Sequence, residues 1–568
     1  MRFKGNLGLL FLWLGMCALC VPLRAQGTCA SPTVGYQVNT LPGGLKFAIW
    51  YPSTDAESAF QYQPLLQGSN PLSGSVALNG APASNCGRFP LVIFSHGYAG
   101  CGLQSVFFTE QLARHGYVVA APDHQDASVC SVDGTGSFNF GLVLSSLAFL
   151  NPGGWTDATY IDRKNDVEQL INALVGGGPF GGIIDANRIA VSGHSLGGYT
   201  ALGVAGAWSS WADSRIQAVL AFSPYSQPFT TGRDTIPNVT APAMYQTGLF
   251  DILQPGVSTA YSDANPSKYL GVLKDATHVT WTNLVCSRET TIADCLKSEP
   301  DAAAIDNYGI AFLDRYLRGS GSALLTGSAS AALSSYQRVT TLASVTEGSY
   351  TSPVAPSSIV SAFGDFGAVA AAAGGQNLPT TLSQYSVQVT DAAGTARLAP
   401  LYYVSASQIN YVLPAATQAG TANVSVLSGT TPVAAGTVKV NNVAPSLFAA
   451  QGTLAAGQFL RVAAGGTQTP ELLFDPSTLA PVPVSLSGTD QVYLLLYGTG
   501  MRGFSQSVSA TVGGIPVPVI GPVAQSQFAG LDQINLGPLP ASLQGAGTVS
   551  ITVHLDGLDS NSVTFVVQ

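Results

Sequence analysis

The segment from Arg188 to Leu202 constrains the fold more than any other stretch of this chain. Residues 188–192 (Arg-Ile-Ala-Val-Ser) are an apolar run typical of a buried strand, and residues 198–202 (Gly-Tyr-Thr-Ala-Leu) begin a helix of small residues. Between them stands Gly193-His194-Ser195-Leu196-Gly197, where glycine permits a turn too sharp for larger side chains. The sequence therefore predicts a buried strand that turns at Ser195 directly into a helix.

Further apolar runs alternate with helical stretches around this segment. Runs that are apolar on both faces, as in a covered parallel sheet, lie at 90–95, 117–121, 218–222 and 242–247. Helices are expected at 105–115, 163–175, 195–205 and 301–317. The alternation predicts a doubly wound α/β sheet, in which a site lies at the carboxyl ends of the strands.

The charge density falls sharply near residue 350. Residues 351–568 hold only 12 charged side chains, and their short β-branched runs are separated by turn residues. The sequence Gln408-Ile-Asn410 recurs as Gln533-Ile-Asn535, and a strand beginning Gly-Thr follows each copy. Such repetition indicates two related β-sandwich modules of Ig-like type. We expect an α/β domain at 28–340, a linker at 341–357, and modules at 358–448 and 449–568.

Residues 1–25 have the pattern of a secretory signal peptide. Arg2 and Lys4 form a basic start, an apolar core runs from Leu7 to Val21, and Ala25 precedes the expected cleavage point. No other stretch is long and apolar enough to span a membrane, so we expect an extracellular or periplasmic protein and not an integral membrane protein. Cleavage would leave 19 basic and 31 acidic residues, and this acidic balance argues against nucleic acid as a partner.

Six cysteines remain after such cleavage, and an even number in an exported chain indicates disulfides. The short loop between Cys286 and Cys295 makes that pair the first expectation, followed by Cys101–Cys130 and Cys29–Cys86. Spacing alone leaves the pairing open. The absence of a Cys-x-x-Cys pair after residue 25 argues against a metal site.

A serine on a sharp strand-to-helix turn is typical of the nucleophile elbow of serine hydrolases. Its hydroxyl needs a histidine base and an acid that orients the base, in the chain order Ser, Asp or Glu, His. Only two of the six histidines follow Ser195, and His554 falls in a β module, so we expect His278 as the base. Asp251, after an apolar run and a glycine turn, is the expected acid, and Asp263 is the alternative.

An ester or amide hydrolase of this kind also needs backbone N–H donors for the oxyanion. We expect these donors from Leu196 and from Tyr98, which lies in the glycine-flanked turn 96–100 after the strand 90–95. Arg163 and Asp166, three apart on a helix, predict a structural ion pair. The candidate residues of a substrate cleft are Trp155, Tyr225, Phe229 and Trp281.

Four motifs together resemble one group of α/β hydrolases. They are residues 94–100 (Phe-Ser-His-Gly-Tyr-Ala-Gly), 193–198 (Gly-His-Ser-Leu-Gly-Gly), 248–251 (Gly-Leu-Phe-Asp) and 276–278 (Ala-Thr-His). The group includes dienelactone-hydrolase-like proteins, platelet-activating-factor-acetylhydrolase-like lipases and cutinase-like polyester hydrolases. The resemblance, over roughly residues 40–320, implies a Ser-His-Asp carboxylester hydrolase without metal or organic cofactor, acting on lipid-like, short-acyl or polyester esters. True dienelactone hydrolases carry cysteine where Ser195 stands, so dienelactone chemistry is not implied.

The C-terminal modules resemble β modules appended to exported proteins of soil bacteria, which makes contact with a polymer or a cell surface one of their expected roles. Two other functions stay open on the sequence. One is a serine peptidase of the same fold, although such peptidases typically carry a lid or propeller domain before the sheet. The other is a non-catalytic surface or adhesion protein in which the β modules are the working part.

Overall fold

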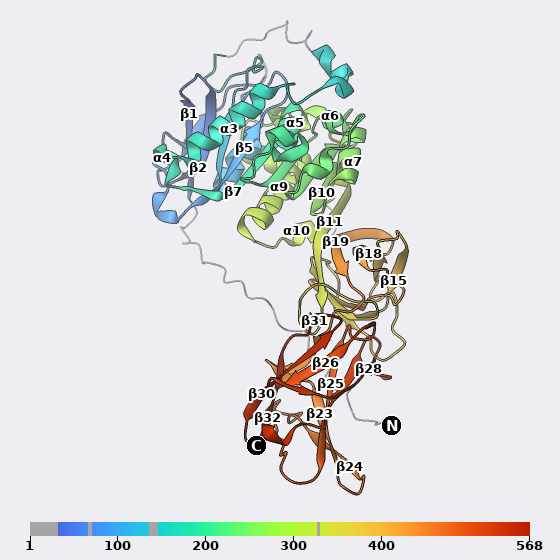
Figure 1. Cartoon of the computed structure of the whole chain (residues 1–568). Coiled ribbons are helices and arrows are strands. Elements are labelled where there is room, and N and C mark those ends of the chain that lie inside the picture. Colours follow the sequence, from blue (N-terminus) through green and yellow to red (C-terminus); the bar gives the residue numbers. More distant parts are fainter. Residues whose placement is uncertain (1–31, 66–70, 136–145, 327–329) are drawn as a thin grey trace. The chain divides into compact units, whose positions relative to one another are not determined.

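The computed structural model describes residues 32–65, 71–135, 146–326 and 330–568. These residues form two compact units, one within Arg24–Val339 and the other containing Thr340–Gln568 (Figure 1). The expected signal peptide at 1–25 and Cys29 lie outside the described residues. None of the helices in the described ranges is long and apolar enough to cross a bilayer.

The first unit is built on a mostly parallel sheet that contains every strand the sequence predicted there. From edge to edge its order is β4 (Ser73–Leu78), β1 (Thr33–Thr40), β2 (Lys46–Ser53), β6 (Val118–Pro122), β5 (Phe89–Ser95), β7 (Ile184–His194), β8 (Ile216–Phe222), β9 (Ala243–Gly248), β10 (Lys268–Leu273) and residues 333–339 of β11 (Leu333–Thr346). A short strand, β3 (Ser58–Gln61), pairs with β4.

The strand order reverses direction at β5, which lies between β6 and β7. Strands β6 through β10 run parallel, so their carboxyl ends meet at one edge of the sheet. In doubly wound sheets the crevice at such a switch point holds the ligand site. The end of β5 at Ser95 and the end of β7 at His194 therefore mark the expected site.

Helices cover both faces of this sheet. One face packs against α1 (Val106–Arg114), α8 (Ile292–Ser298) and α9 (Pro300–Arg318). The other packs against α3 (Ile161–Val175), α5 (Leu196–Leu202) and α7 (Gln254–Asp263). Along β5, Val92 and Phe94 join the first core and Leu91 and Ile93 the second, as the period of a strand requires. Three further helices are a single turn long: α4 (Gly178–Gly181), α6 (Gln227–Thr230) and α10 (Ala323–Thr326). The prediction of a doubly wound α/β fold is confirmed.

Two of the three expected disulfides are formed. Cys101 joins Cys130 across a separation of 29 residues, and Cys286 joins Cys295 across 9. The first bridge ties the loop after β5 to the loop after β6, because its two cysteines follow those strands. The pairing of Cys86 with Cys29 cannot be described, since Cys29 lies outside the described residues.

The second unit begins with a two-sheet sandwich. One sheet contains residues 342–346 of β11, β12 (Ile359–Gly364), β17 (Gln408–Val412), β16 (Leu401–Val404) and β13 (Ala371–Ala372). The other contains residues 340–341 of β11, β19 (Thr431–Val440), β18 (Gly420–Ser428), β14 (Tyr385–Thr390) and β15 (Ala396–Ala399). Leu342 and Val354, within the expected linker, pack in its core.

A second sandwich follows it. Its first sheet holds β24 (Gln468–Leu472), β23 (Gly457–Val462), β25 (Gln491–Thr499), β29 (Asp532–Leu536) and β28 (Val519–Ala524), with β20 (Ser446–Leu447) on β25. Its second sheet holds β21 (Ala449–Gln451), β22 (Leu454–Ala455), β32 (Val563–Val567), β30 (Gly547–Leu555), β26 (Val508–Val512), β27 (Ile515–Val517) and β31 (Leu558–Asp559). Val443 and Leu447 belong to its core, so this sandwich starts before residue 449.

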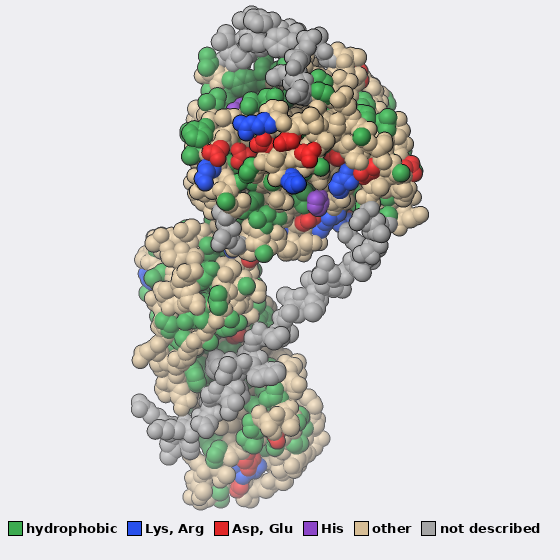
Figure 2. Space-filling view, turned by 180° about the vertical axis from the view of Figure 1, so that it is seen from behind, with side chains coloured by type: hydrophobic (Ala, Val, Ile, Leu, Met, Phe, Trp, Pro, Cys, Tyr) green, Lys and Arg blue, Asp and Glu red, His purple; other side chains and the backbone are tan. Residues whose placement is uncertain are grey.

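The repeat found in the sequence occupies equivalent positions in the two sandwiches. The Gln-Ile-Asn copies lie in β17 and β29, and the following Gly-Thr segments begin β18 and β30. In each copy the glutamine Nε2 donates to the asparagine Oδ1 two residues on, at 2.9 Å. On the face drawn in Figure 2, charged side chains gather on the first unit and are sparse on the sandwiches, as the composition predicted.

The disulfide between Cys101 and Cys130 should stabilise the first unit more than the one between Cys286 and Cys295, because it closes a longer loop. We expect a C101A/C130A variant to lose about 3–4 kcal/mol of unfolding free energy, and C286A/C295A about 1 kcal/mol less. Urea unfolding followed by tryptophan fluorescence isolates this unit, since every tryptophan after Trp13 lies within it. Equal losses in the two variants would contradict the loop-length argument.

Glu347, which follows β11, should make the second unit less stable as pH rises from acid to neutral. Burial raises the pKa of its carboxyl to about 8, although a hydrogen bond from Asn410 opposes the shift. A group whose pKa is raised on folding stabilises the fold below its unfolded pKa and loses that effect as pH rises through the folded pKa. The wild type should therefore lose stability between about pH 4.5 and 8, relative to Glu347→Gln, which keeps an oxygen acceptor for Asn410.

Calorimetry of the full chain tests this expectation. It records the unfolding of residues 340–568, which contain no tryptophan and are not followed by tryptophan fluorescence. Glu347→Gln should match the wild type near pH 4.5 and be a few kcal/mol more stable near pH 9. A constant difference between the two proteins over this range would rule out a buried, protonated Glu347.

Candidate active site

Ser195 stands on a strained turn between β7 and α5. Its backbone adopts φ 56° and ψ −117°, a conformation that costs a non-glycine residue about 1–3 kcal/mol. Hydrogen bonds on both sides hold it there: its N–H donates to Phe222 O at 2.9 Å, and its carbonyl accepts from the N–H groups of Tyr199 (3.1 Å) and Tyr225 (3.0 Å). The sharp turn predicted from the sequence is present.

The glycines around Ser195 are required by the close approach of α5 to β5. A Cβ on Gly197 would lie 1.9 Å from the carbonyl oxygen of Ser95, which is backbone and cannot move aside. A Cβ on Gly193 would lie 2.4 Å from the carbonyl oxygen of Gly197. The turn is therefore pressed against the end of β5, next to the loop 96–100.

Ser195, His278 and Asp251 come together at the carboxyl ends of the strands. His278 Nε2 lies 2.9 Å from Ser195 Oγ, and His278 Nδ1 lies 3.1 Å and 3.3 Å from the two carboxylate oxygens of Asp251. Asp251 follows β9 and its side chain is fully buried, whereas the His278 side chain is 28% exposed. The three contacts form one continuous chain from hydroxyl to imidazole to carboxylate.

Ser223 is a fourth member of this cluster that the sequence analysis missed. It follows β8, is fully buried, and has a φ of 40°. Its hydroxyl donates a short hydrogen bond to Asp251 Oδ2 and lies 3.1 Å from His278 Nδ1. Its place at the carboxyl end of the strand next to β9 is the signal that could have identified it.

These contacts keep the Asp251 carboxyl ionised. Burial raises the pKa of the Asp251 carboxyl. The hydrogen bond and charge of His278 and the hydrogen bond from Ser223 lower that pKa by more, so it lies below its ordinary value. The N–H of Leu253 also donates to Asp251 Oδ1 at 2.9 Å. A carboxylate held in this way can orient an imidazole and stabilise its cation.

The two residues predicted to supply backbone donors lie in segments next to Ser195. Leu196 is the first residue of α5, and its N–H makes no hydrogen bond within the described part of the chain. Tyr98 lies in the loop 96–100 that follows β5. This loop adjoins the turn, because a Cβ on Gly97 would lie 3.5 Å from Ser195 Cβ.

His194 links two loops beside Ser195 by hydrogen bonds, the loop that follows β5 and the loop that follows β10. Gly97 N–H donates to Gln104 Oε1 (2.8 Å), Gln104 Nε2 lies 3.0 Å from His194 Nδ1, and His194 Nε2 lies 2.7 Å from the carbonyl oxygen of His278. Burial lowers the pKa of His194 to about 3, so the ring is neutral, accepts at Nδ1 and donates at Nε2. Hydrogen bonds through His194 therefore connect the backbone at His278 to the loop 96–100.

Two of the four candidate cleft residues lie in an aromatic cluster beside Tyr98. The ring of Phe149 lies 5.2 Å from that of Tyr98, 5.3 Å from Trp155 and 4.8 Å from Tyr225. Trp155 and Tyr225 are buried, and the N–H of Tyr225 bonds to the Ser195 carbonyl. This aromatic cluster packs against Tyr98, and the Tyr225 N–H connects it to Ser195; its role as a substrate wall stays a prediction.

The other two candidates, Phe229 and Trp281, are fully buried and pack in the core. Phe229 stacks on Tyr199 with ring centroids 5.1 Å apart. Trp281 lies parallel to His194 at 6.4 Å and donates from Nε1 to Gln246 Oε1. Their apolar character reflects core packing, which sequence alone does not distinguish from a cleft.

The expected ion pair between Arg163 and Asp166 is replaced by two longer-range contacts. Arg163 binds Asp126 at 2.7 Å, and Asp166 lies 2.8 Å from His124 Nδ1. Both helix residues point toward the sheet, where partners from the loop after β6 lie closer than they do to each other.

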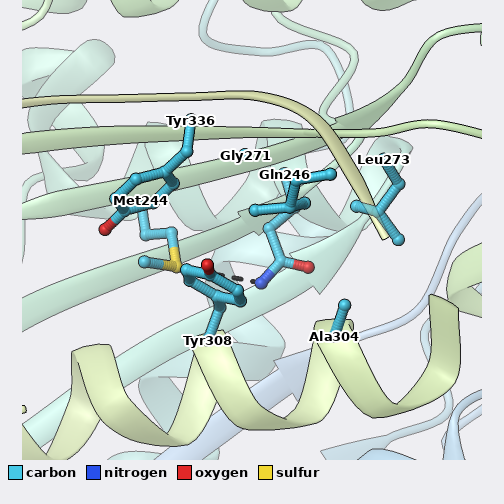
Figure 3. Close-up of a pocket in the computed structure, with 8 residues that line it drawn as sticks. Met244, Gln246, Gly271, Leu273, Ala304, Tyr308 and Tyr336 are labelled. Atoms are coloured by element: carbon cyan, nitrogen blue, oxygen red, sulfur yellow. Dashed lines mark hydrogen bonds between the residues drawn. The ribbon is translucent and has the colours of Figure 1, made fainter. Parts of the chain in front are cut away.

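A small internal cavity lies elsewhere, between the sheet and α9 (Figure 3). It leaves no room for a water molecule, and Gln246 Nε2 spans it to Met244 Sδ at 3.8 Å. It is therefore a packing gap, lined by Met244, Gln246, Gly271, Leu273, Ala304, Tyr308, Leu333 and Tyr336. Among the described residues, no group of three metal-ligating side chains is gathered.

Comparison with known proteins finds a similarity between part of the first unit and one hydrolase family. The family model for platelet-activating factor acetylhydrolase, isoform II, matches residues 41–134, which include the loop 96–100. A ferulic acid esterase from Streptomyces cinnamoneus aligns at 22% identity with a TM-score of 0.40, over 55% of this chain and 99% of that structure. No curated protein sequence matches the chain. The first unit therefore combines a doubly wound α/β fold with a similarity, over residues 41–134, to the platelet-activating factor acetylhydrolase family.

Proposed function

We propose that the first unit is a serine carboxylester hydrolase in which Ser195 is the nucleophile, His278 the general base and Asp251 the acid. The observation that carries the proposal is the unbroken contact chain from Ser195 Oγ through His278 to Asp251, with Ser195 held on a strained turn. A serine hydroxyl is a weak nucleophile until a base removes its proton, and the 2.9 Å contact with His278 Nε2 suits that transfer.

In the first step, Ser195 Oγ attacks the ester carbonyl carbon while its proton passes to His278 Nε2. The carbonyl electron pair moves to oxygen, and the N–H groups of Leu196 and Tyr98 would bind the oxyanion that results. The ionised Asp251 stabilises the imidazolium across the Nδ1 contact.

In the second step, His278 returns the proton to the departing alcohol and the acyl group stays on Ser195. A water molecule then attacks the acyl carbonyl and His278 takes its proton; the bond between the acyl carbon and Ser195 Oγ breaks, His278 returns the proton to Ser195 Oγ, and the acid product leaves. None of these steps needs a metal or organic cofactor. The aromatic wall formed by Phe149, Trp155 and Tyr225 suits an apolar acyl or aryl group, which agrees with lipid-like, short-acyl or polyester esters.

Replacing Ser195 by alanine tests the proposal directly. Ser195→Ala should lower kcat for a short p-nitrophenyl ester by several orders of magnitude, on the order of 10⁶, because no other group can form the acyl enzyme. Exposed Ser287 offers a matched control, and Ser287→Ala should keep wild-type activity. Full activity of Ser195→Ala would rule out Ser195 as the nucleophile.

The same assay separates the rival functions. A panel of esters of graded chain length, a phospholipid, a polyester film and a peptide should show hydrolysis of esters in preference to the peptide. Equal cleavage of peptide and ester bonds would favour a serine peptidase. Binding of a polymer or cell wall without any hydrolysis would favour an adhesion role for the β modules.

Ser223→Ala should weaken catalysis without removing it. The loss of one hydrogen bond to the buried Asp251 carboxylate costs about 1.5–3 kcal/mol, so kcat should fall by about 10- to 100-fold. The steady-state kcat of Ser226→Ala is the control, because Ser226 is equally buried in the same loop but donates to the Gly256 carbonyl. Unchanged kcat in Ser223→Ala would show that His278 and Asp251 need no third partner.

The export of the protein belongs to the same proposal. The basic and apolar pattern of residues 1–25 and the two disulfides support a secreted enzyme, extracellular or periplasmic. The two-sheet sandwiches with their repeated Gln-Ile-Asn strands support Ig-like modules that space the enzyme from a surface or attach it to a polymer.

A further inference from the structure

The guanidinium of Arg163 is completely buried beneath the loop 96–100. Arg163 is the third residue of α3 and its side chain has no exposed surface. One edge of the guanidinium grips the carboxylate of Asp126, with Nε 3.0 Å from Oδ1 and Nη2 2.7 Å from Oδ2. This two-point contact fixes the plane of the guanidinium as well as its position.

The other edge of the guanidinium binds the loop itself. Nη1 donates to the carbonyl of His96 at 2.7 Å, and Nη2 donates to the carbonyl of Gly97 at 3.3 Å. Nη1 also lies 3.3 Å from Ser95 Oγ. Two consecutive carbonyls of the loop are thus turned inward, toward a single buried cation.

The Gly97 carbonyl is held by two further donors. His96 Nδ1 lies 2.7 Å from it and Gly100 N–H donates to it at 3.0 Å. His96 Nε2 accepts from His124 N–H, so the proton of this neutral ring is on Nδ1, where it can donate. Three donors from different directions leave this carbonyl one orientation.

The orientation of the Gly97 carbonyl determines that of the Tyr98 N–H. The two groups belong to one planar trans peptide and point in opposite directions. With the carbonyl directed inward to Arg163, the Tyr98 N–H is directed away from it. The next amide is also fixed, because Ala99 N–H donates to Asp126 Oδ2 at 3.0 Å.

We propose that Arg163, held by Asp126, is a positioning residue that aims the Tyr98 N–H at the oxyanion formed on Ser195. The inference rests on the proposed ester hydrolysis and adds to it the group that sets one of its two oxyanion donors. Arg163 does not touch the substrate; it acts through the Gly97–Tyr98 peptide. Arg163, which the sequence predicted to pair with Asp166, therefore pairs with Asp126 and has a role in the site.

Lysine cannot replace this arginine, because an ammonium group cannot grip a carboxylate at two points and bind two carbonyls in one plane. Loss of one oxyanion donor lowers kcat by about 10²–10³ in other enzymes, so partial misalignment in Arg163→Lys should lower kcat by about 10- to 100-fold. KM should change little, because the donor acts on the charge that develops in the transition state.

The experiment compares ester turnover with the affinity of an alkyl trifluoromethyl ketone. Ser195 Oγ adds to this ketone, its proton passes to His278, and the carbonyl electron pair becomes an oxyanion that resembles the transition state. In Arg163→Lys, the inhibition constant should rise by the same factor by which kcat/KM falls. A merely structural effect would lower the melting temperature without this proportionality.

Arg114→Lys is the matched control. Arg114 is also an arginine paired with a carboxylate and a carbonyl: its Nη1 donates to both carboxylate oxygens of Glu57, and its Nη2 donates to the carbonyl of Ser75 in β4. It should lose stability and keep both kcat and the inhibition constant. Asp126→Asn is the second test variant, since it removes the charge that holds Arg163 while keeping the size of the side chain.

Each variant is assayed after circular dichroism shows the wild-type spectrum. Wild-type inhibition constants and kcat in both folded Arg163→Lys and Asp126→Asn would overturn the inference, and so would failure of both variants to fold, which would assign the network to the fold alone. If instead the wild type and Ser195→Ala hydrolyse the ester equally, it is the proposed function that fails.

Discussion

The contact between Gly197 and the carbonyl of Ser95 is the constraint on which the site depends. It brings the start of α5 so close to the end of β5 that a Cβ on residue 197 would clash with the Ser95 carbonyl. Ser195, which adopts positive φ, and the loop 96–100 consequently lie side by side. The strain of that turn is offset by backbone hydrogen bonds from two flanking segments, so the hydroxyl is aimed by the fold and not by its own preference.

A second layer of buried polar groups keeps this arrangement in place. Burial lowers the pKa values of His96 and His194 to about 3, so both rings stay neutral and each uses one nitrogen to donate and the other to accept. The buried cation beneath the loop 96–100, Arg163, is paired with Asp126, and although burial raises the pKa of the Asp126 carboxyl, the charge of Arg163 lowers it. Paired charges with every donor satisfied hold one geometry, whereas an unpaired buried group would favour rearrangement.

Different sequence patterns revealed the organisation of the two units. Strands such as 90–95 and 218–222 are apolar on both faces, and a covered parallel sheet is the one architecture that buries both. The repeated strands of the sandwiches were identified in another way, from the recurrence of Gln-Ile-Asn at 408–410 and 533–535. Neither pattern identified β1 and β2, which the structure shows as an antiparallel pair.

The sequence by itself determined the turn at Ser195 and the order of Ser195, Asp251 and His278 along the chain, and it favoured two disulfides whose pairing it left open. These follow from short-range rules: glycine spacing, the scarcity of histidine, and loop length. Only the tertiary structure decided that Ser223 joins Asp251, that Arg163 pairs with Asp126 instead of Asp166, and that Phe229 and Trp281 are core. The physical reason is that a polar or aromatic side chain pairs with whatever the fold brings within a few ångströms, and those partners come from strands and loops far away in the chain.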